Sequence, residues 1–246
     1  MKGATKNPYE TQRYLHEYLL FHYGDPEDLG PFDFVPRAWL NFHQRLRTEC
    51  LLPQRSKGRI RALDLGCGVG RFSFELSLVA DEVLGIDYSK AFIEAAGKMA
   101  RNHSMALSIA ESGKVIRKIN VELPGDLRKA NVRFETGDAI ELRRWAGKPF
   151  QIVAAINLLC RLPSPRKFLA NVHSMVAPGG QLLLASPYSW LEQYTPPNEW
   201  LTARDVEKLL RKEFRLERRH DLPFVIREHR RKYQLVVPEV LTFRRK

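Results

Sequence analysis

The sequence Arg59-Ile-Arg-Ala-Leu-Asp-Leu-Gly-Cys-Gly-Val-Gly-Arg71, followed ten residues later by Glu82-Val-Leu-Gly-Ile-Asp87, carries the strongest indication of the architecture. The apolar run at 60–65 predicts a short buried strand, and Gly66, Gly68 and Gly70 follow it at alternate positions. Apolar residues at helical spacing predict a helix over 69–80, and 82–86 predicts a second strand that ends on Asp87. A strand, a glycine loop, a helix and a strand in this order are typical of a nucleotide-binding α/β unit.

The spacing of the loop indicates which kind of ligand it holds. Glycine tolerates unusual backbone angles and lets a ligand reach the main chain, and Asp87 is placed to accept hydrogen bonds from a ribose diol. A dinucleotide loop usually reads G-x-G-x-x-G, and Asp64 would face its pyrophosphate unfavourably. A tight turn in a domain without a nucleotide is the alternative. The pattern resembles motif I of the class I S-adenosylmethionine (SAM) methyltransferases, whose ligand carries an ammonium and a sulfonium and no phosphate.

Length and composition indicate one large α/β domain with additions. The chain has 246 residues, of which 44% are hydrophobic. It contains no run of 18 apolar residues, so we expect no membrane span. The N-terminus shows no apolar signal region. The three cysteines, Cys50, Cys67 and Cys160, are isolated in the sequence, so we expect a reducing, cytoplasmic environment and no structural metal.

The net charge of +12 raises the question of a polyanionic partner. Residues 204–246 hold 14 Lys and Arg against 7 Asp and Glu, a net of +7. A basic segment of this kind suits either nucleic acid or a solvated protein surface. No recognisable nucleic-acid-binding module accompanies it, so we expect no nucleic-acid partner. The lack of a long apolar run leads us to expect no membrane partner.

Alternating strand and helix patterns extend over most of the chain and predict a doubly wound, mostly parallel, seven-stranded sheet. Strands are expected at 132–135, 150–156, 181–185, 214–219 and 231–243, and helices at 89–100, 165–175 and 202–212, with a turn at 177–180. Alternation at 113–123 predicts a strand within an insertion at about 101–130. We expect residues 1–58, with helices at 7–24 and 36–50, to form an N-terminal helical lid. Residues 59–246 would then form the core, and the whole chain would be one structural domain.

Ligands of such sheets bind outside the carboxyl ends of the strands. Those ends carry Asp64, Asp87, Asp138, Asn157 and residues 186–188. The segment 7–24 holds four of the eight tyrosines, arranged in two stripes at helical spacing. Such a helix either covers the sheet or presents rings to a pocket, because tyrosine has an apolar face and a polar tip.

Four segments together resemble one particular family, the methyltransferases of ovothiol biosynthesis. They are Asn7-Pro-Tyr-Glu-Thr11 with Tyr18-Leu-Leu-Phe-His-Tyr-Gly24, Leu63-Asp-Leu-Gly-Cys-Gly-Val-Gly-Arg-Phe-Ser-Phe-Glu-Leu76, Ala185-Ser-Pro-Tyr-Ser-Trp-Leu-Glu-Gln-Tyr-Thr-Pro196, and Asp221-Leu-Pro-Phe-Val-Ile-Arg-Glu-His-Arg-Arg-Lys-Tyr-Gln234. The resemblance implies transfer of a methyl from SAM to the imidazole π-nitrogen of 5-thiohistidine, giving ovothiol A and S-adenosylhomocysteine (SAH). Many members are fused to an iron-dependent sulfoxide synthase. This chain has no His-x-x-x-His-x-Glu iron motif and resembles the stand-alone form.

Motif position then suggests a role for each residue. The loop would cradle the methionine part of SAM, Asp64 would approach its ammonium, Asp87 its ribose and Asp138 its adenine amine. The full expected cofactor set is Asp64, Gly66, Cys67, Gly68, Gly70, Asp87, Tyr88, Asp138, Ala139 and Asn157. A turn at Asp138 and a strand-end cap at Asn157 are the structural alternatives.

The acceptor site is expected to be aromatic with one arginine. The substrate set is Tyr9, Tyr14, Tyr18, Ser186, Tyr188, Arg227 and Tyr233, and Arg227 is the first choice for the substrate carboxylate because arginine binds carboxylates through two hydrogen bonds. The catalytic candidates are Asn157, Tyr9, His22 and Tyr188, and a capping role for His22 is as plausible as a role as base.

Three other functions compete with this interpretation. An RNA or protein methylase fits the basic C-terminal segment, but no Asn-Pro-Pro-Tyr motif follows the fourth core strand. A nicotinamide dehydrogenase is disfavoured by the glycine spacing, and a non-catalytic SAM-binding regulator stays open. We expect a monomer or a weak homodimer.

Overall fold

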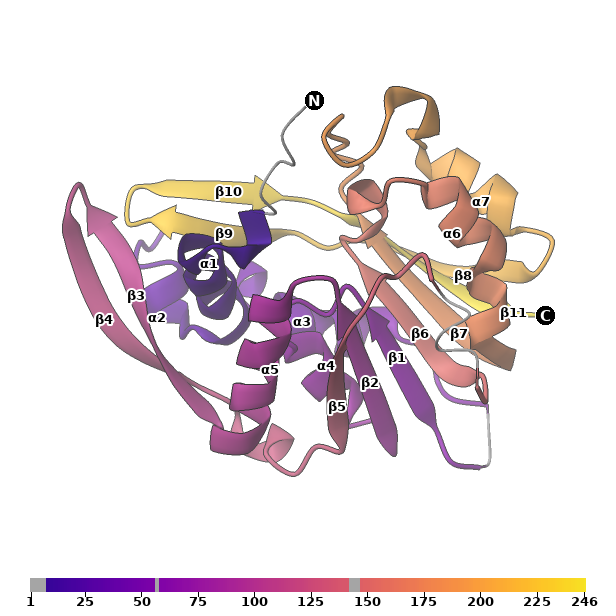
Figure 1. Cartoon of the computed structure of the whole chain (residues 1–246), viewed down its shortest axis with the longest axis horizontal. Helices are drawn as coiled ribbons and strands as arrows, with labels where there is room; N and C mark the ends of the chain where they lie inside the picture. Colours follow the sequence, from indigo (N-terminus) through magenta and orange to yellow (C-terminus); the bar gives the residue numbers. More distant parts are fainter. Residues whose placement is uncertain (1–7, 56–57, 142–146) are drawn as a thin grey trace.

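A seven-stranded sheet forms the centre of the computed structural model, which describes residues 8–55, 58–141 and 147–246 (Figure 1). Within these residues the strand order is β5-β2-β1-β6-β7-β11-β8. The bounds are β1 (Arg61–Leu65), β2 (Glu82–Asp87), β5 (Val132–Thr136), β6 (Phe150–Ile156), β7 (Val176–Ser186), β8 (Phe214–Asp221) and β11 (Glu239–Arg245). The pairs among β5, β2, β1, β6 and β7 are parallel, and β11 runs antiparallel to both β7 and β8. The predicted doubly wound, mostly parallel sheet is confirmed.

Helices cover both faces of this sheet because its central strands are apolar on both sides. On one face, Leu63 of β1 and Leu182 of β7 share a core cluster with helices α6 (Pro165–Asn171) and α7 (Ala203–Leu210). On the other face, Ala62 and Leu183 share a cluster with α3 (Phe42–Arg45), the π-helical turn Leu46–Cys50 and α4 (Arg71–Leu76). Helix α5 (Lys90–Asn102) packs beside β2 and β5.

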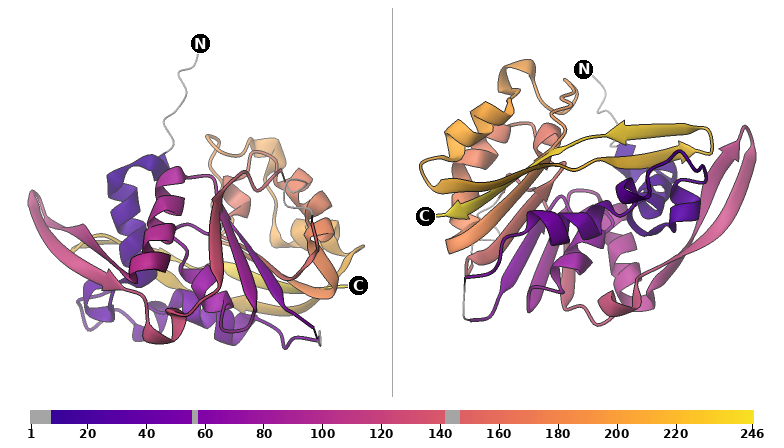
Figure 2. Two further views of the ribbon diagram at one scale, coloured as in Figure 1. Left: turned by 60° about the horizontal axis from the view of Figure 1, so that its bottom comes forward. Right: turned by 180° about the vertical axis from the view of Figure 1, so that it is seen from behind.

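A third apolar cluster lies beyond the sheet, around the N-terminal helix α1 (Gln12–Tyr23), the short helix α2 (Pro26–Leu29) and two hairpins. The hairpins are β3 (Ser104–Ser112) with β4 (Val115–Glu122), and β9 (Phe224–His229) with β10 (Lys232–Val236). Leu19 and Leu20 of α1 pack there with Leu107 of β3 and Val225 of β9. Figure 2 shows α1 lying between the two hairpins. The chain's additions therefore gather at one end of the sheet.

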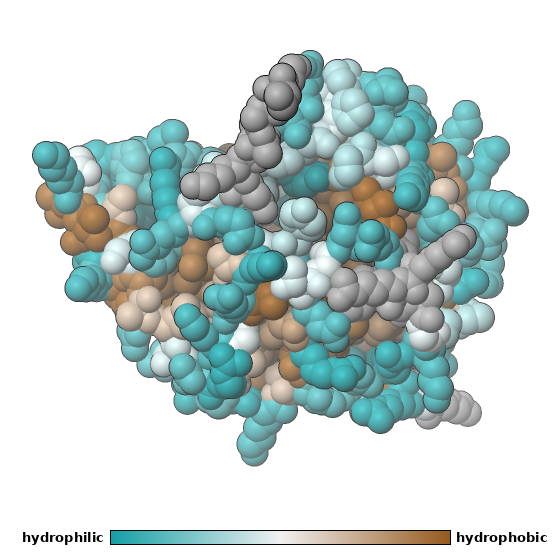
Figure 3. Space-filling model, in the orientation of Figure 1, coloured by the Kyte–Doolittle hydropathy of each residue, from teal (hydrophilic) through white to brown (hydrophobic). Residues whose placement is uncertain are grey.

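A buried ion pair joins the two hairpins. Arg227 of β9 pairs with Glu111 of β3 at 2.9 Å, and it also donates to the backbone oxygen of Asp28 in α2. Arg117 of β4 pairs with the same Glu111 and with Asp28. The outer strand of the β3–β4 hairpin still exposes Val115 and Ile116. Figure 3 shows an apolar area at the left edge of the molecule, the end at which Figure 1 shows this hairpin.

Several predicted boundaries were wrong. The single strand expected at 231–243 is divided between β10 and β11, and β9 precedes them, because residues 224–236 leave the sheet as a hairpin. Strand β3 was not predicted, since only Leu107 and Ile109 turn inward from a mostly small and polar segment.

Local backbone changes account for the remaining differences. The turn expected at 177–180 lies inside β7 as a bulge, where the register shifts and Gly179 adopts a φ of 71°. The helix expected at 36–50 divides into a 3₁₀ turn (Arg37–Trp39), α3 and the π turn. Helix α4 is shorter than predicted, and α6 continues into the 3₁₀ turn Val172–Met175. Other 3₁₀ turns are Pro8–Glu10 (η1), Gly125–Leu127, Leu159–Arg161 (η6) and Pro197–Glu199.

Part of the expected N-terminal lid cannot be compared with the structure. Residues 1–7 of the expected lid, and residues 56–57 before the first strand, lie outside the described residues. Among the residues that are described, no helix combines the length and the apolar character needed to cross a membrane.

We predict that Gly70 tolerates no side chain. A Cβ there would lie 2.7 Å from the ring of Phe134 at a φ of 93°, so Gly70→Ala combines backbone strain with a collision. We expect the free energy of unfolding in urea to fall by about 2–5 kcal/mol. Gly113→Ala is the matched control, because Gly113 also has positive φ but has no atom within 4 Å of a built Cβ. Its cost should be about 1 kcal/mol, from backbone strain alone. Equal losses in the two variants would contradict the role of Phe134.

Candidate active site

The glycine loop is a tight cradle at the carboxyl end of β1. Gly66, Gly68 and Gly70 have φ values of 71°, 57° and 93°, a region that disfavours side chains. The N–H groups of Gly66 and Cys67 both donate to the backbone oxygen of Ile86, at 2.8 and 3.0 Å. A Cβ on Gly66 would lie 2.9 Å from Leu158, and one on Gly68 would lie 3.3 Å from the His22 ring. The loop is thus fixed between β2, the end of β6 and the N-terminal helix.

Asp87 is bound to this loop. Its Oδ2 accepts the N–H of Gly68 at 2.9 Å, and its Oδ1 accepts the N–H of Ser89 at 2.8 Å. Burial raises the pKa of Asp87, and the two backbone donors oppose that rise. A carboxylate oxygen can accept more than one hydrogen bond, so Asp87 keeps capacity for a diol.

Asp64 lies deeper than the sequence suggested. Its side chain is 1% exposed, and its Oδ2 accepts the hydroxyl of Ser73 in α4 at 2.7 Å. Burial is the main cause that raises the pKa of Asp64 to about 7, and the charge of Asp87 adds to it. Asp64 therefore joins β1 to α4 through Oδ2, and its contact with a ligand's ammonium stays a prediction.

Asp138 and Ala139 follow β5 beside Asp87. The N–H of Gly137 donates to the backbone oxygen of Asp87 at 3.0 Å, so the two strand ends are adjacent. Asp138 Oδ1 accepts the N–H of Ile140 at 2.8 Å, which is the turn considered as an alternative. Ala139 is buried, and Tyr88 is 70% exposed. Cys67 is also buried within the loop.

Asn157 has an unsatisfied polar atom. It adopts a φ of 54° at the end of β6, and its N–H donates to the backbone oxygen of Ala185 at 2.8 Å. Its Oδ1 is buried and has no hydrogen-bond partner among the described residues. Leaving a buried acceptor unpaired costs about 1–3 kcal/mol. The next residue, Leu158, is the one that a Cβ on Gly66 would meet, so Asn157 adjoins a residue that packs on the loop, and its oxygen is available to a ligand's donor.

Helix α1 contacts the glycine loop on the side away from Asp87. Arg71, the first residue of α4, donates its backbone N–H to His22 Nδ1 at 3.4 Å. The hydroxyl of Tyr23 donates to the backbone oxygen of Val69 at 2.7 Å. His22 thus caps a helix whose N-cap residue, Gly70, has no side chain.

This contact argues against His22 as the general base. Burial, with the Arg71 charge as a second cause, lowers the pKa of His22 to about 3. The ring is therefore neutral, and with Nδ1 accepting a hydrogen bond its proton lies on Nε2. Neither nitrogen is available to accept a proton, so the capping interpretation replaces the catalytic one.

Tyrosine rings form a wall at the same edge of the sheet. The ring of Tyr9 lies edge-on to Tyr14 and Tyr18, both at 5.8 Å, and stacks with Tyr194 at 6.4 Å. Arg161 Nε donates to the Tyr9 hydroxyl at 3.3 Å, and its guanidinium carbon lies 5.3 Å from the centre of the Tyr194 ring. Sequence reasoning missed Arg161 and Tyr194. The available signals were that Arg161 is the first charged residue after the strand at 150–156, and that Tyr194 is the last ring of the quoted 185–196 segment.

The turn Pro8–Glu10 is anchored on α5. Both carboxylate oxygens of Glu10 accept backbone N–H groups, from Lys90 at 2.9 Å and from Ala91 at 3.4 Å. Ser89 donates its hydroxyl to the backbone oxygen of Tyr9 at 3.2 Å. Because Ser89 also binds Asp87, the tyrosine wall and the acid are fixed by the same helix N-terminus.

Ser186 and Tyr188 are directed elsewhere. Ser186 Oγ accepts the N–H of Tyr188 at 3.1 Å, and the Tyr188 hydroxyl donates to Glu239 at 3.1 Å. Burial and the neighbouring Glu239 raise the pKa of Tyr188. The ring lines a separate open groove together with Trp190, Trp200, Leu201, Thr202, Ala203 and Glu239. These contacts do not bring Tyr188 to the glycine loop, so they give no support to a catalytic role.

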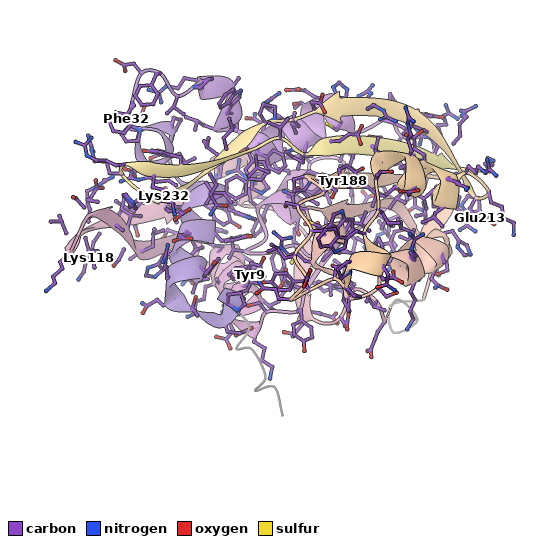
Figure 4. The ribbon with its side chains drawn as sticks, turned by 90° about the horizontal axis from the view of Figure 1, so that it is seen from above. Tyr9, Phe32, Lys118, Tyr188, Glu213 and Lys232 are labelled. Atoms are coloured by element: carbon purple, nitrogen blue, oxygen red, sulfur yellow. The ribbon has the colours of Figure 1, made fainter. Side chains whose placement is uncertain are left out.

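Arg227 and Tyr233 belong to the hairpins. Arg227 is engaged by Glu111 and the backbone of Asp28, so the structure corrects our assignment of it to the substrate carboxylate. The Tyr233 hydroxyl donates to the backbone oxygen of Arg230, and its ring lies edge-on to Phe32. Figure 4 shows Phe32, Lys118 and Lys232 together at one end of the molecule, opposite Glu213. Arg227 was placed wrongly because residues 224–236 leave the sheet as a hairpin and carry it to Glu111.

Several cations of the basic C-terminal segment are paired with carboxylates of the same segment, whose net charge remains +7. Ion pairs connect Arg215 and Arg244 to Glu217, Arg219 to Glu207 and Glu239, and Lys232 to Glu228. Within the described ranges, no group of three or more His, Cys, Asp or Glu is arranged to hold a metal ion.

Comparison with known proteins now identifies this architecture. A family model described as "Methyltransferase domain" matches residues 33–232. The chain belongs to the SAM-dependent methyltransferases. Its glycine cradle, Asp87 and the unpaired Asn157 oxygen fit the donor of this family, which offers ribose hydroxyls, an ammonium group and an adenine amine.

Curated relatives of this methyltransferase chain are ubiquinone biosynthesis O-methyltransferases. The protein of Coxiella burnetii is 24% identical over 172 residues, covering 66% of this chain and 62% of the relative. That of Burkholderia multivorans is 28% identical over 195 residues, covering 76% and 66%. The chain thus spans less than two thirds of the Coxiella protein's length.

Solved structures show the same fold. Magnesium protoporphyrin IX methyltransferase of Synechocystis PCC 6803 with bound SAM has a TM-score of 0.60, 17% identity and complete coverage of both chains. The N-methyltransferase NodS of Bradyrhizobium japonicum WM9 has a TM-score of 0.55 and 17% identity, covering 83% of this chain and 96% of its own.

We predict that Asp87→Ala weakens SAH binding. The substitution removes the acceptor for a diol and releases the Gly68 N–H. Losing hydrogen bonds to a charged group should lower the affinity about 10- to 100-fold by calorimetry. Glu94→Ala removes an exposed carboxylate from the same helix region and should leave the affinity unchanged. An unchanged affinity in Asp87→Ala would remove this residue from the site.

We predict that His22 makes stability depend on pH. Its folded-state pKa of about 3 lies below its ordinary value of 6.5, so the unfolded chain binds the proton first as pH falls. The stabilisation is complete above pH 6.5 and is lost progressively below it. In His22→Asn the amide oxygen can replace Nδ1 but does not titrate. The stability difference between pH 7 and pH 5 should therefore be about 2 kcal/mol smaller in the variant than in the wild type. Identical pH profiles in urea denaturation would contradict this.

Proposed function

We propose that the protein transfers the methyl group of SAM to the imidazole π-nitrogen of 5-thiohistidine, giving ovothiol A and SAH. The observation that carries the proposal is the tyrosine wall, whose rings Tyr9, Tyr14 and Tyr18 come from the N-terminal segment that also contacts the glycine loop. Aromatic faces suit a planar imidazole, and rings make favourable contacts with sulfur. The four segments that resemble the ovothiol family support the same acceptor.

The donor would be held by the chain as follows. The loop backbone and the Asn157 oxygen would receive the methionine part, Asp87 the ribose, and Asp138 with Ala139 the adenine. When bound, SAM supplies an electrophilic methyl on a sulfonium that is a good leaving group. The remaining contributions come from residues of the chain that orient the acceptor and exclude water.

Orientation should contribute most of the acceleration. The nitrogen lone pair forms the new N–C bond while the S–C bond breaks and its electron pair stays on sulfur. Positioning of this kind contributes up to about 7–11 kcal/mol in favourable reactions. The acceptor ring then loses its other N–H proton to solvent.

The tyrosine hydroxyls act here as hydrogen-bonding groups. Burial raises the pKa of Tyr18 well above its ordinary value, so this residue stays protonated and does not act as an anionic base. A hydroxyl oxygen can still accept the imidazole N–H and fix the ring's tautomer, which leaves the attacking lone pair free. Tyr9 and Tyr18 are therefore the residues we assign to the acceptor.

An O-methyl acceptor is the second candidate, because the curated relatives are O-methyltransferases. A phenol would also fit against tyrosine rings. We further propose a reducing, cytoplasmic setting, in agreement with three cysteines that are all free and buried.

The acceptor panel separates these possibilities. Purified protein is incubated with SAM and, in parallel, 5-thiohistidine, histidine and a catechol, and products are identified by mass spectrometry. We expect 5-thiohistidine to react at least about tenfold faster than histidine, because the site is lined by rings suited to its sulfur. Equal rates on the two histidines would contradict the thiohistidine assignment, and preferred methylation of the catechol would favour the O-methyl alternative.

A further inference from the structure

We infer that Arg161 binds the carboxylate of the acceptor, and that this contact selects amino-acid acceptors over the corresponding amines. The inference rests on the proposed function and adds to it the residue that determines specificity. It replaces Arg227, which the structure commits to Glu111.

Arg161 lies where an acceptor would enter. It is the last residue of η6, the 3₁₀ turn Leu159–Arg161, four positions after Asn157 at the carboxyl end of β6. Its Nε donates to the hydroxyl of Tyr9, and its guanidinium lies over the ring of Tyr194. Among the described residues, Arg161 is therefore the only cation that follows a sheet strand and contacts the tyrosine wall.

The hydrogen bonds of Arg161 leave one end of the guanidinium available. Nη1 donates to the backbone oxygens of Cys160 at 3.0 Å and Ser189 at 2.9 Å. Nη2 makes no hydrogen bond with any described residue, and no described Asp or Glu forms an ion pair with Arg161. A half-buried charge without a counterion is costly, and a planar guanidinium matches a carboxylate. The two carbonyls fix the group's orientation before a ligand binds.

Two carboxylates could meet this group, that of the acceptor and that of the donor's methionine part. The geometry favours the acceptor. The Arg161 contacts are with Tyr9, Tyr194 and Ser189, whereas the groups suited to the donor are Gly68, Asp87 and Asn157. An imidazole against the tyrosine rings would place its amino-acid end toward the guanidinium.

The test compares two acceptors that differ only in the carboxylate, 5-thiohistidine and 5-thiohistamine. We expect the wild type to show a KM at least about tenfold lower for the acid, since a charge-assisted pair is among the strong hydrogen bonds. Arg161→Met should raise the KM of the acid by about the same factor and change that of the amine much less, because the amine has no carboxylate and loses only the support that Arg161 gives to Tyr9. Arg161→Lys should fall between them, because lysine keeps the charge but not the fork.

Controls separate the possible failures. Arg166→Met removes a nearby exposed arginine of α6 and should change neither KM. SAH affinity, measured by calorimetry, should stay within about twofold in Arg161→Met. A selective loss of SAH affinity would assign Arg161 to the donor's carboxylate and overturn the inference, as would equal KM values for acid and amine in the wild type. That wild-type comparison decides even if the variant fails to fold.

Failure of the proposed function gives a different result. If neither thiolated acceptor is methylated, the acceptor assignment is wrong, and SAH-loaded protein is titrated with histidine and histamine instead. At least about tenfold tighter binding of histidine would support the role of Arg161 independently of the reaction. Equal binding of the two would overturn it.

Discussion

The contact between helix α1 and the glycine loop is the constraint on which the rest of the site depends. Three hydrogen bonds define it among the described residues. Arg71 donates its backbone N–H to the His22 ring and its Nη1 to the His22 backbone oxygen, and the hydroxyl of Tyr23 donates to Val69. Asp87 holds the same loop from the opposite side through the Gly68 N–H. Because glycine at position 68 leaves room for the His22 ring, the helix can approach closely enough to form its bonds.

A buried cluster of ion pairs on α4 stabilises this contact. Glu75 of α4 is nearly inaccessible and pairs with Arg71 at 2.8 Å and with Arg47 of the π turn at 2.9 Å. Removing one partner of such a pair leaves an uncompensated charge and is strongly destabilising. The orientation of α4, and with it the loop, is therefore set by groups that cannot change independently.

The sheet was predictable from the sequence and the acceptor site was only partly so, for physical reasons. Strands such as β6 are continuous apolar runs, and a glycine loop with an acid at the end of the next strand suits few kinds of site besides a nucleoside one. The edge residues Asp87 and Asn157 follow directly from the topology.

The acceptor side was less predictable. Arg227 was misassigned because an arginine among apolar residues gives the same sequence pattern whether its partner is a ligand or Glu111. His22 was undecided, since only the distance to Arg71 distinguishes a cap from a base. Tyr194 and Arg161 meet across the fold, and no local pattern reports that.

The anchoring of Glu10 on the first turn of α5 has a kinetic consequence. The segment that carries Tyr9 is anchored on the same helix end that holds Asp87, so the proposed acceptor wall and the carboxylate proposed for the ribose are joined through that helix end. Under the proposed function, a nucleoside held by Asp87 would exchange most easily while that segment is detached, which predicts an ordered sequence with the donor first and its spent form last. Departure of the nucleoside, more than bond making, would govern the rate of each cycle.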